Sequence, residues 1–410
     1  MDQSIHIVGG GISGIIAALE LESAGLKPII YEKQDHLGGR VRTDYIDGYP
    51  FDRGFQVLLT AYPEAQRYLD YEELELQPFL SGSRVYYQGK TVRIGDPLSS
   101  ATFWLDSLDP TLSTLKDKIK TLQLSLRLKG KSFSDIFSED ETSALEYLQG
   151  LGFSDRVIER FFTPFFGGIF LETELRTSSR LFEFLFKMFG NGNSVIPKGG
   201  MQKISDQLAN KLKQTKILTS TSVEAVAPGY ITLSDGTTIP SAHTIIATDL
   251  SQGIQTQKTV KWKRSINYYF EVDTPNYTDK IITLSANPDR LINNYYYPTN
   301  LIPHPQGKTI LSTTVINDRG LSEEAMLDKI KDELKQTGVQ GDLSLITSYD
   351  IPYSLPDTSD IQFEHTPDKI VLDKGIYNCG DHTMMGSLNA AMYSGRYVAQ
   401  HIINLSLIHI

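Results

Sequence analysis

Short apolar runs separated by glycines dominate the start of the chain. Ile5-His6-Ile7-Val8 is a run of strand type, residues 15–24 have the apolar spacing of a helix, and Pro28-Ile29-Ile30-Tyr31 is a second strand-like run. The pattern therefore predicts a strand, a tight turn, a helix and a second strand in immediate succession.

Further along, the pattern separates into a helical region and a strand-rich region. Residues from about 86 to 190 are expected to be mostly helical, with clear periodicity from Leu112 to Leu128. Residues from about 255 to 350 are expected to form strands and one helix, from Ser322 to Gln336. The last part of the chain returns to a strand, which is followed by a helix that begins near Leu388.

The turn after the first strand has the G-x-G-x-x-G spacing of a dinucleotide-binding site. Its three glycines would permit a tight turn, a close approach of the backbone to a pyrophosphate, and close packing of helix on strand. The N-terminus of the helix would offer free N–H groups to the phosphates. An acid at the end of the second strand is placed to accept hydrogen bonds from the ribose hydroxyls. The residues expected to bind the dinucleotide here are Gly9, Gly11, Ile12, Ser13, Gly14, Glu32 and Lys33.

A second glycine segment, Leu37-Gly38-Gly39-Arg40-Val41-Arg42-Thr43, follows within a few positions. Two glycines beside two arginines suit a backbone that lies against the pyrophosphate while guanidinium groups neutralise it. With this segment the sequence resembles the flavin-containing amine oxidase superfamily, which includes phytoene desaturases and protoporphyrinogen oxidases. The resemblance implies FAD rather than NAD, and we expect it to be bound non-covalently. It also implies that the cofactor contacts Gly38, Gly39 and Arg40.

The resemblance recurs near the end of the chain, where residues 376–381 are strand-like and finish in Gly-Asp. In the superfamily such a strand and a following helix, whose N-terminus points at the flavin pyrimidine, close the FAD site. This implies that Asp381 binds the ribityl chain or the pyrophosphate, and that the helix stabilises negative charge on reduced flavin. Ala390 stands where the superfamily usually has glycine, so its methyl group changes how closely the backbone meets the ring. The residues implied at this end are Gly380, Asp381, Ser387, Leu388, Asn389 and Ala390.

Two shorter segments also resemble the superfamily. Asp52-Arg53-Gly54 stands where an Asp-x-Gly often meets the flavin ring, which implies contacts from Gly54, Phe55 and Gln56. Phytoene desaturases commonly place a histidine near that glutamine, and this chain does not. Ser222-Val223-Glu224-Ala225-Val226 resembles the strand whose valine contacts the adenine, and Asp235-Gly236 after it is typical of a hairpin turn.

Together these matches imply an α/β fold built of two domains. The first is a Rossmann-like FAD-binding domain whose parallel sheet is discontinuous in sequence, expected from residues 1–85, 190–254 and 355–410. The second is an inserted α+β substrate-binding domain, with a helical part at 86–189 and a β-rich part at 255–354.

Aromatic side chains are concentrated in the helical region, within residues 161–189. They would either line an apolar substrate tunnel above the flavin or fill the core of a helical subdomain, and core packing is expected for most of them. Tyrosines at 268–269 and 295–297 lie in strand-like runs, so only alternate ones can face one side. No side chain stands out as a catalyst and no metal site is expected, so the chemistry is assigned to the cofactor.

The amino-acid composition excludes some classes of binding partner and indicates a cellular compartment. Lys and Arg number 39 against 49 Asp and Glu, so the formal net charge is −10, which argues against non-specific binding to nucleic acid or to an anionic membrane. The single cysteine, Cys379, excludes an intramolecular disulfide, and one thiol suits a reducing compartment, so the cytoplasm is expected. No apolar stretch reaches the roughly 20 residues that span a bilayer. An exposed apolar face on the helical insertion would still permit a peripheral membrane contact.

The predicted function is the transfer of hydride from a substrate C–H to flavin N5. We expect a dehydrogenase or desaturase of a small apolar molecule, isoprenoid- or tetrapyrrole-like, with oxygen or a quinone as electron acceptor. This branch is favoured because residues 164–168 and 197–201 resemble it. The alternatives are a flavin amine oxidase that acts on a small amine and a non-catalytic flavin-binding carrier.

Overall fold

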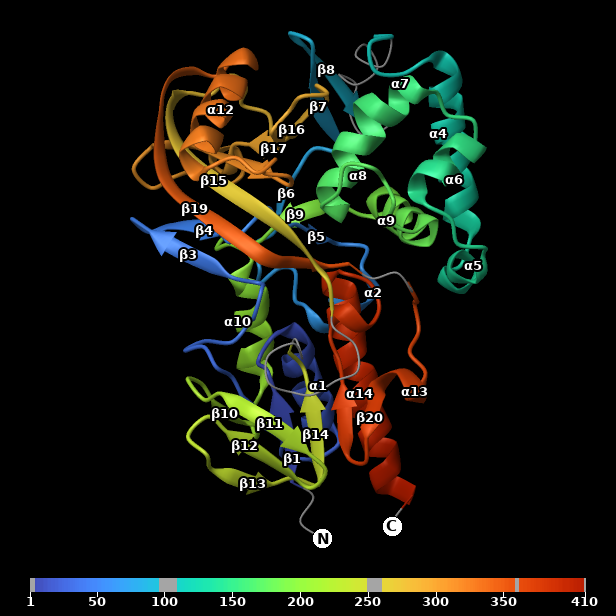
Figure 1. Cartoon of the computed structure of the whole chain (residues 1–410), viewed down its shortest axis with the longest axis vertical. Coiled ribbons are helices and arrows are strands. Elements are labelled where there is room, and N and C mark those ends of the chain that lie inside the picture. Colours follow the sequence, from blue (N-terminus) through green and yellow to red (C-terminus); the bar gives the residue numbers. More distant parts are fainter. Residues whose placement is uncertain (1–3, 96–108, 249–259, 358–360, 409–410) are drawn as a thin grey trace.

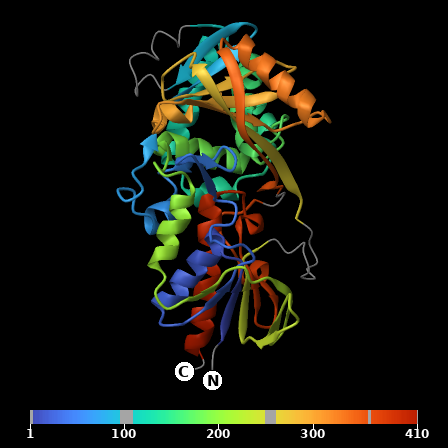
Figure 2. The same ribbon diagram turned by 90° about the vertical axis from the view of Figure 1, so that its left-hand side faces the viewer.

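The computed structural model describes residues 4–95, 109–248, 260–357 and 361–408. It has two lobes along its long axis, and both ends of the chain lie in the lower lobe (Figure 1). The lower lobe is layered, with a parallel sheet between a group of helices and a small antiparallel sheet (Figure 2). The upper lobe holds a large sheet flanked by helices on both sides.

The lower sheet has six strands in the order β10-β2-β1-β14-β21-β20. All neighbouring pairs are parallel except β20 with β21, which is antiparallel. Because the strands are parallel, the ends of β1, β2, β14 and β21 meet at one edge of the sheet. The strands are β1 (Ile5–Val8), β2 (Ile29–Tyr31), β10 (Lys216–Leu218), β14 (His243–Ile246), β20 (Val371–Asp373) and β21 (Ile376–Asn378).

Helices cover one face of this sheet and a three-stranded sheet covers the other (Figure 2). The predicted hairpin at Asp235-Gly236 is confirmed, since β12 and β13 pair in antiparallel register around it. The helices are α1 (Ile12–Ser23), α2 (Pro63–Tyr68), α10 (Gln202–Lys211), α13 (Pro367–Ile370) and α14 (Leu388–Ile408), and the small sheet is β11 (Val223–Ala227), β12 (Tyr230–Leu233) and β13 (Thr238–Pro240).

The upper sheet has seven strands in the order β19-β15-β18-β17-β16-β7-β8. Only β16 and β7 pair in parallel, and the other neighbours are antiparallel. The strands are β7 (Gly82–Tyr87), β8 (Lys90–Gly95), β15 (Trp262–Thr274), β16 (Ile282–Ser285), β17 (Ile292–Tyr296), β18 (Thr309–Val315) and β19 (Gln340–Pro356).

One expectation about this region is wrong. Residues 86–95 were expected to be helical, but they complete the hairpin of β7 and β8. Gln88 and Gly89 both have positive φ, 47° and 81°, which is the conformation of a two-residue hairpin turn. Gln-Gly is a weaker turn signal than Asn-Gly or Asp-Gly. The helical periodicity of the residues that follow therefore led to a prediction of helix for residues 86–95. The strand β7 also crosses the expected domain boundary at residue 85, and the division into domains stays a prediction.

The helical part of the upper lobe begins its helices at polar caps. Thr114, Ser132 and Ser143 each cap a helix by accepting a hydrogen bond from the backbone three residues on. Within the described ranges, no helix is both long and apolar enough to cross a membrane. The elements are α4 (Leu115–Gly130), α5 (Phe133–Ser138), α6 (Ala144–Gly150), α7 (Asp155–Val157), the π-helical turn η1 (Ile158–Phe162), α8 (Thr163–Phe170) and α9 (Ser179–Asn191).

A further helix, α12 (Glu323–Gln336), packs its apolar side on the upper sheet, close to the predicted span. The remaining short elements are β3 (Thr43–Ile46), β4 (Tyr49–Asp52), β5 (Leu58–Leu59), β6 (Gln77–Pro78), β9 (Ser194–Ile196), α11 (Pro298–Leu301) and the 3₁₀ turn η2 (Asp381–Thr383). The strands β3 and β4 pair with each other, and β5, β9 and β6 form a small sheet in that order.

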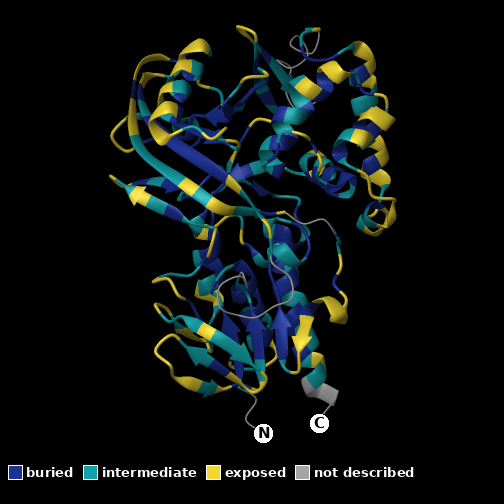
Figure 3. Cartoon of the chain, viewed as in Figure 1, coloured by how far each residue is buried: buried dark blue, intermediate teal, exposed yellow. Residues whose placement is uncertain are grey.

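Buried residues follow the strands of both sheets, whereas exposed residues gather on outer helices such as α4 and α12 (Figure 3). The tyrosines divide between the two faces of the upper sheet, as the strand alternation predicts. Tyr269 and Tyr296 belong to the core that the two lobes share, and the α12 side holds Tyr268, Tyr295 and Tyr297. Within residues 161–189, the phenylalanines that fill the core are Phe162, Phe166, Phe170, Phe182 and Phe184, and those only partly buried are Phe161, Phe165, Phe186 and Phe189.

Candidate functional site

The turn between β1 and α1 admits only glycine at two of its motif positions. Gly9 has φ +106°, and a Cβ added there would lie 2.8 Å from the carbonyl oxygen of Ala247 at the end of β14. A Cβ on Gly14 would lie 2.1 Å from the carbonyl oxygen of Gly9, which is far inside van der Waals contact. The steric reasons that the sequence motif suggested are therefore present in the fold.

The second glycine segment lies directly against this turn. Gly38 pairs with Gly11 as a parallel bridge and donates its N–H to the carbonyl of Gly10 at 2.9 Å. A Cβ on Gly39 would lie 3.2 Å from the Cα of Gly11, so the two loops meet through bare backbone. Gly11 begins α1 without a side-chain hydrogen bond, and the first-turn residues Ile12 and Ser13 are buried. The result is a cradle at a helix N-terminus that a Cβ would fill, which fits a pyrophosphate.

Glu32 stands beside this cradle. Its buried carboxylate accepts hydrogen bonds from the backbone N–H of Gly10 at 2.7 Å and of Gln34 at 2.8 Å. These bonds hold the carboxylate toward the glycine turn, where its remaining lone pairs could accept from ribose hydroxyls. The neighbouring Lys33 is exposed. The carbonyl of Glu32 accepts from Thr221 at 2.9 Å, which brings Val223, at the start of β11, to the same side of the site.

The Gly-Asp after β21 reaches the same site from the other end of the chain. The buried carboxylate of Asp381 forms an ion pair with the guanidinium of Arg40, 341 positions away. Arg40 also donates to the carbonyl of Ser354 at 3.2 Å and lies over the ring of Trp262, 5.0 Å from its centre. Gly380 donates its N–H to the hydroxyl of Ser394 on α14 at 2.9 Å. Arg40 therefore ties the first glycine region to both lobes.

The N-terminus of α14 is held by its own side chains. Ser387 accepts from the N–H of Ala390 at 3.1 Å, and the side-chain oxygen of Asn389 accepts from the N–H of Glu64 on α2 at 3.0 Å. Ala390 is buried in the shared core, whereas Leu388 packs only partly against it. Asn389 and Ala390 point into the protein, and the N–H of Ala390 already donates to Ser387. A contact of Asn389 with a flavin would therefore come from its backbone.

The segment after β4 completes the set of expected residues. Gly54 has φ +93°, and a Cβ there would lie 2.9 Å from the Cδ1 atom of Ile351 on β19. Phe55 packs against Tyr296 with ring centres 5.1 Å apart. Gln56 donates to the carbonyl of Arg40 at 3.0 Å, so this segment is bonded to the second glycine loop.

Asp52 is a buried acid at the junction of the lobes. From the sequence it was named only as the first residue of the Asp-x-Gly motif, and no role was assigned to it. It accepts hydrogen bonds from the hydroxyl of Thr43 at 2.5 Å and the N–H of Met201 at 2.8 Å, and its carbonyl accepts from the hydroxyl of Tyr269 at 2.8 Å. Burial raises the pKa of the Asp52 carboxyl to about 6, although both hydrogen bonds to the carboxylate oppose this. The Asp-x-Gly spacing was the one feature of the sequence that could have pointed to this buried acid.

A polar row on the upper sheet was not anticipated. Asn267 and Ser312 hydrogen-bond to each other, at 3.0 and 3.2 Å, on the sheet face that also carries Tyr269. Alternation along the strands places Asn294 and Thr314 on the same face. The side-chain nitrogen of Asn294 and the hydroxyl of Thr314 are buried without a hydrogen-bond partner among the described residues. Two asparagines inside an otherwise aromatic strand were the signal for this row.

Other candidate groups lie outside this arrangement. Lys198 pairs with Glu75 at 2.7 Å, and both side chains are exposed. His365 hydrogen-bonds to the hydroxyl of Thr383 at 3.0 Å, and burial, followed by the charges of His382 and Lys369, lowers its pKa to about 4. Within the described ranges, no cluster of three or more histidine, cysteine, aspartate or glutamate side chains could hold a metal ion.

Comparisons with curated proteins find relatives that include an oxidase and an oxygenase. Over 165 residues the chain is 29% identical to protoporphyrinogen oxidase 2 of Arabidopsis thaliana, a stretch that covers 40% of this chain and 32% of the relative. Over 91 residues it is 29% identical to 4,4'-diaponeurosporene oxygenase of Staphylococcus aureus, which covers 22% of this chain and 18% of the relative. The chain thus matches about a third or less of the length of these relatives.

Solved structures extend the likeness to the whole chain at the level of the fold. Putrescine oxidase bound to putrescine superimposes with a TM-score of 0.67 over 98% of this chain and 99% of its own, at 17% identity. The α/β fold expected from the sequence is therefore confirmed. The family model of flavin containing amine oxidoreductases matches residues 12–403. The chain therefore belongs to the flavin containing amine oxidoreductase family, and flavin is the cofactor of that family.

Proposed function

We propose that this protein oxidises a C–H bond of a small apolar molecule with FAD, bound non-covalently at the edge of the six-stranded sheet. When bound, FAD supplies the hydride acceptor at its N5 atom. The observation that carries the proposal is the bare-backbone cradle between Gly11 and Gly39, which has a buried acid on each side, Glu32 and Asp381.

The chain's own residues divide the work of binding the cofactor. The free N–H groups at the start of α1 would bind the pyrophosphate, and the carboxylate of Glu32 would bind the ribose hydroxyls. Arg40 holds Asp381 in a fixed position, so that this carboxylate can accept from a hydroxyl of the ribityl chain. Backbone N–H groups near Ala390 would stabilise negative charge on the reduced ring.

An apolar substrate is favoured by the aromatic wall beside this site. Phe55, Phe79 and Tyr296 pack against one another, with ring centres 5.1 to 6.3 Å apart, at the junction of the lobes. The names of the relatives, a protoporphyrinogen oxidase and a diaponeurosporene oxygenase, support the same choice. The amine oxidase alternative is supported by the fold that the chain shares with putrescine oxidase.

The reductive half-reaction tests this proposal. FAD should co-purify in equimolar amount and should be released into the supernatant by acid precipitation. Protoporphyrinogen, diaponeurosporene and putrescine are then added separately, without oxygen, and the flavin absorbance is followed. Bleaching by one of the first two supports the proposal, and bleaching by putrescine alone favours the amine oxidase. Bound FAD that no organic substrate reduces would favour the carrier. Readmitting air or adding a quinone identifies the acceptor.

A peripheral membrane contact is supported by the outer face of α4. Leu115, Ile119, Leu122 and Leu126 are 52 to 74% exposed, and their spacing of four, three and four positions puts them on one side of the helix. The opposite side, with Leu124, is buried against the helical part. Lysines 116, 118 and 129 add positive charge to the same helix, in a chain whose net charge is −10. An amphipathic helix with basic residues and exposed leucines suits the surface of an anionic bilayer.

Vesicle flotation tests the membrane contact. The protein should float with vesicles of phosphatidylglycerol and phosphatidylcholine, and Leu122→Asp with Leu126→Asp should abolish this while FAD stays bound. The control is Leu372→Asp, an exposed leucine on β20 in the lower lobe. Flotation that the α4 changes do not alter would exclude this helix as the contact.

A further inference from the structure

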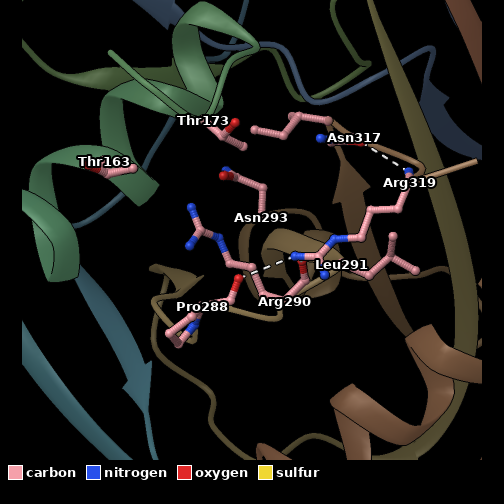
Figure 4. Close-up of a pocket in the computed structure, with 9 residues that line it drawn as sticks. Thr163, Thr173, Pro288, Arg290, Leu291, Asn293, Asn317 and Arg319 are labelled. Atoms are coloured by element: carbon pink, nitrogen blue, oxygen red, sulfur yellow. Dashed lines mark hydrogen bonds between the residues drawn. The ribbon is translucent and has the colours of Figure 1, made fainter.

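A pocket of about 340 Å³ lies in the upper lobe, where β17 begins, β18 ends and α8 begins. Arg290 reaches from below toward Thr163 and Asn293, and Arg319 extends across from the loop after β18 (Figure 4). Threonine hydroxyls and asparagine amides make up much of the remaining wall. We call this site the two-arginine pocket. Among the residues that the structure describes, two guanidinium groups and no carboxylate line it.

Neither arginine is neutralised by an acid among the described residues. Arg290 donates only a long hydrogen bond, 3.4 Å, to the carbonyl of Asn287 in its own turn. Arg319 uses one nitrogen, Nη2, to donate to the carbonyls of Pro288 at 3.2 Å and Arg290 at 2.9 Å. The other N–H groups of both side chains are thus left for a ligand.

The nearest acids are already engaged. Glu333 on α12 accepts from the N–H groups of Leu291 at 2.8 Å and Ile292 at 3.0 Å. Asp318 forms an ion pair with Arg264, on the neighbouring strand β15. The carboxylates close to the pocket therefore hold backbone and another cation in place, and they compensate the positive charge of the pocket only in part.

The two guanidinium groups also affect each other. Burial, followed by the charge of Arg319, lowers the pKa of Arg290 to about 10, and the carboxylate of Glu333 opposes this only in part. Two cations held this close favour an anion between them. A guanidinium binds a carboxylate or a phosphate in a bidentate manner, and threonine hydroxyls such as that of Thr163 can donate to the same oxygens.

A line of polar residues leads from the pocket toward the proposed flavin site. Asn293 lines the pocket and donates to the side-chain oxygen of Asn294 at 3.2 Å. Asn294 shares a sheet face with Tyr296, which packs on Phe55. The distance along the strand from Asn293 to Tyr296 is about 10 Å, since each residue rises by about 3.3 Å.

We propose that the two-arginine pocket binds an oxyanion, a carboxylate or phosphate, at one end of the substrate, while the other end lies over the flavin. This rests on the proposed function, and it makes the substrate an elongated apolar molecule with an anionic terminus. The buried polar row beside Asn294 would then face the middle of that molecule.

The test compares decanoate, decyl phosphate and decanol, which share one chain length and differ in the head group. Calorimetric titration of the FAD-loaded protein should show at least about tenfold tighter binding for one of the two anions than for decanol. The same titration should perturb the flavin absorbance, because the chain reaches the ring. Equal binding of all three compounds would overturn the proposal.

Substitutions of the two arginines test whether the preference for an anionic head group comes from the pocket. Arg290→Gln should remove the preference for the anion, and Arg319→Gln, at an exposed side chain, should weaken it if the first variant fails to fold. Arg176→Gln removes the same charge from a side chain that is 78% exposed in the same lobe, and should change nothing. A preference that survives both pocket variants would overturn the proposal.

Inorganic phosphate distinguishes a substrate subsite from a separate anion site. If phosphate alone binds through Arg290, and neither decanoate nor decyl phosphate perturbs the flavin, the substrate assignment is wrong. FAD content and flavin reduction are measured independently, so a failure of the pocket cannot be mistaken for a failure of the proposed oxidation.

Discussion

The cradle in the lower lobe and the polar sheet face in the upper lobe solve recognition in different ways. The cradle is made of backbone, with Gly39 so close to Gly11 that an added Cβ would lie 3.2 Å from the Cα of Gly11. The sheet face is made of side chains, including the buried side-chain nitrogen of Asn294 and the hydroxyl of Thr314, which find no hydrogen-bond partner among the described residues. A backbone site is fixed by sterics, whereas a side-chain site can change with single substitutions and leave the fold intact.

The largest effect is expected from a substitution that disrupts the cradle. Gly14→Ala places a Cβ 2.1 Å from the carbonyl oxygen of Gly9, so strand and helix must separate. We expect a loss of about 3 kcal/mol or more in the free energy of unfolding, as for overpacked cores, together with loss of FAD. Urea unfolding and FAD content measure both.

The control is Gly130→Ala, because a Cβ at Gly130 meets nothing within 4 Å. It lies at the end of α4, where alanine should be neutral or slightly stabilising. If both variants behave alike, the steric account of the turn is wrong.

The next effect concerns Asp52, which joins the two regions. Its pKa is raised to about 6 in the folded protein, against about 3.9 in the unfolded chain. Between these values the folded state binds more protons, so the free energy of unfolding falls as pH rises from about 4 to 6 and is level above that. The fall should be about 3 kcal/mol from this group, and Asp52→Asn should remove it. Identical pH profiles of unfolding for both proteins would contradict this.

A smaller effect is expected at the acid beside the cradle. Glu32→Ala removes charge-assisted hydrogen bonds to the ribose, each of which contributes about 1.5–3 kcal/mol. The dissociation constant of FAD should therefore rise at least about tenfold in titrations of the apo-protein. Lys27→Ala, at an exposed position before β2, should leave it unchanged. If the two variants bind FAD equally, Glu32 points elsewhere.

The smallest expected effect is on stability, and it comes from substitutions on the polar face of the upper sheet. Thr314→Val replaces a buried hydroxyl that has no partner among the described residues, so stability should hold or rise by up to about 1 kcal/mol. Ser312→Ala removes a hydroxyl that donates to Asn267, and should lower stability by about 1 kcal/mol. Thermal unfolding of the two variants checks the contrast. A destabilised Thr314→Val would show that its hydroxyl is in fact satisfied.

The difference between the backbone cradle and the side-chain sheet face also decides which features the sequence could predict. The first glycine turn and Glu32 were foreseeable from their local spacing, and the Gly-Asp near residue 380 from the resemblance to the superfamily. The pairing of Arg40 with Asp381 was not, since it joins positions 341 apart. Asn389 was expected to bind the cofactor, yet its side chain bonds to α2, a contact that no local pattern encodes. The hairpin of β7 and β8 was missed because Gln88-Gly89 is an uncommon turn pair.

The contact of α14 with α1 sets the order in which the protein can mature. A Cβ on Gly395 would lie 2.2 Å from the carbonyl oxygen of Ser13, so the late helix seats directly on the early glycine turn. A ribosome has to release residues 380–395 before the cradle acquires its second acid and its covering helix. Until then the nascent chain would expose an incomplete nucleotide site, and FAD could find its full set of contacts only after the last helix has folded.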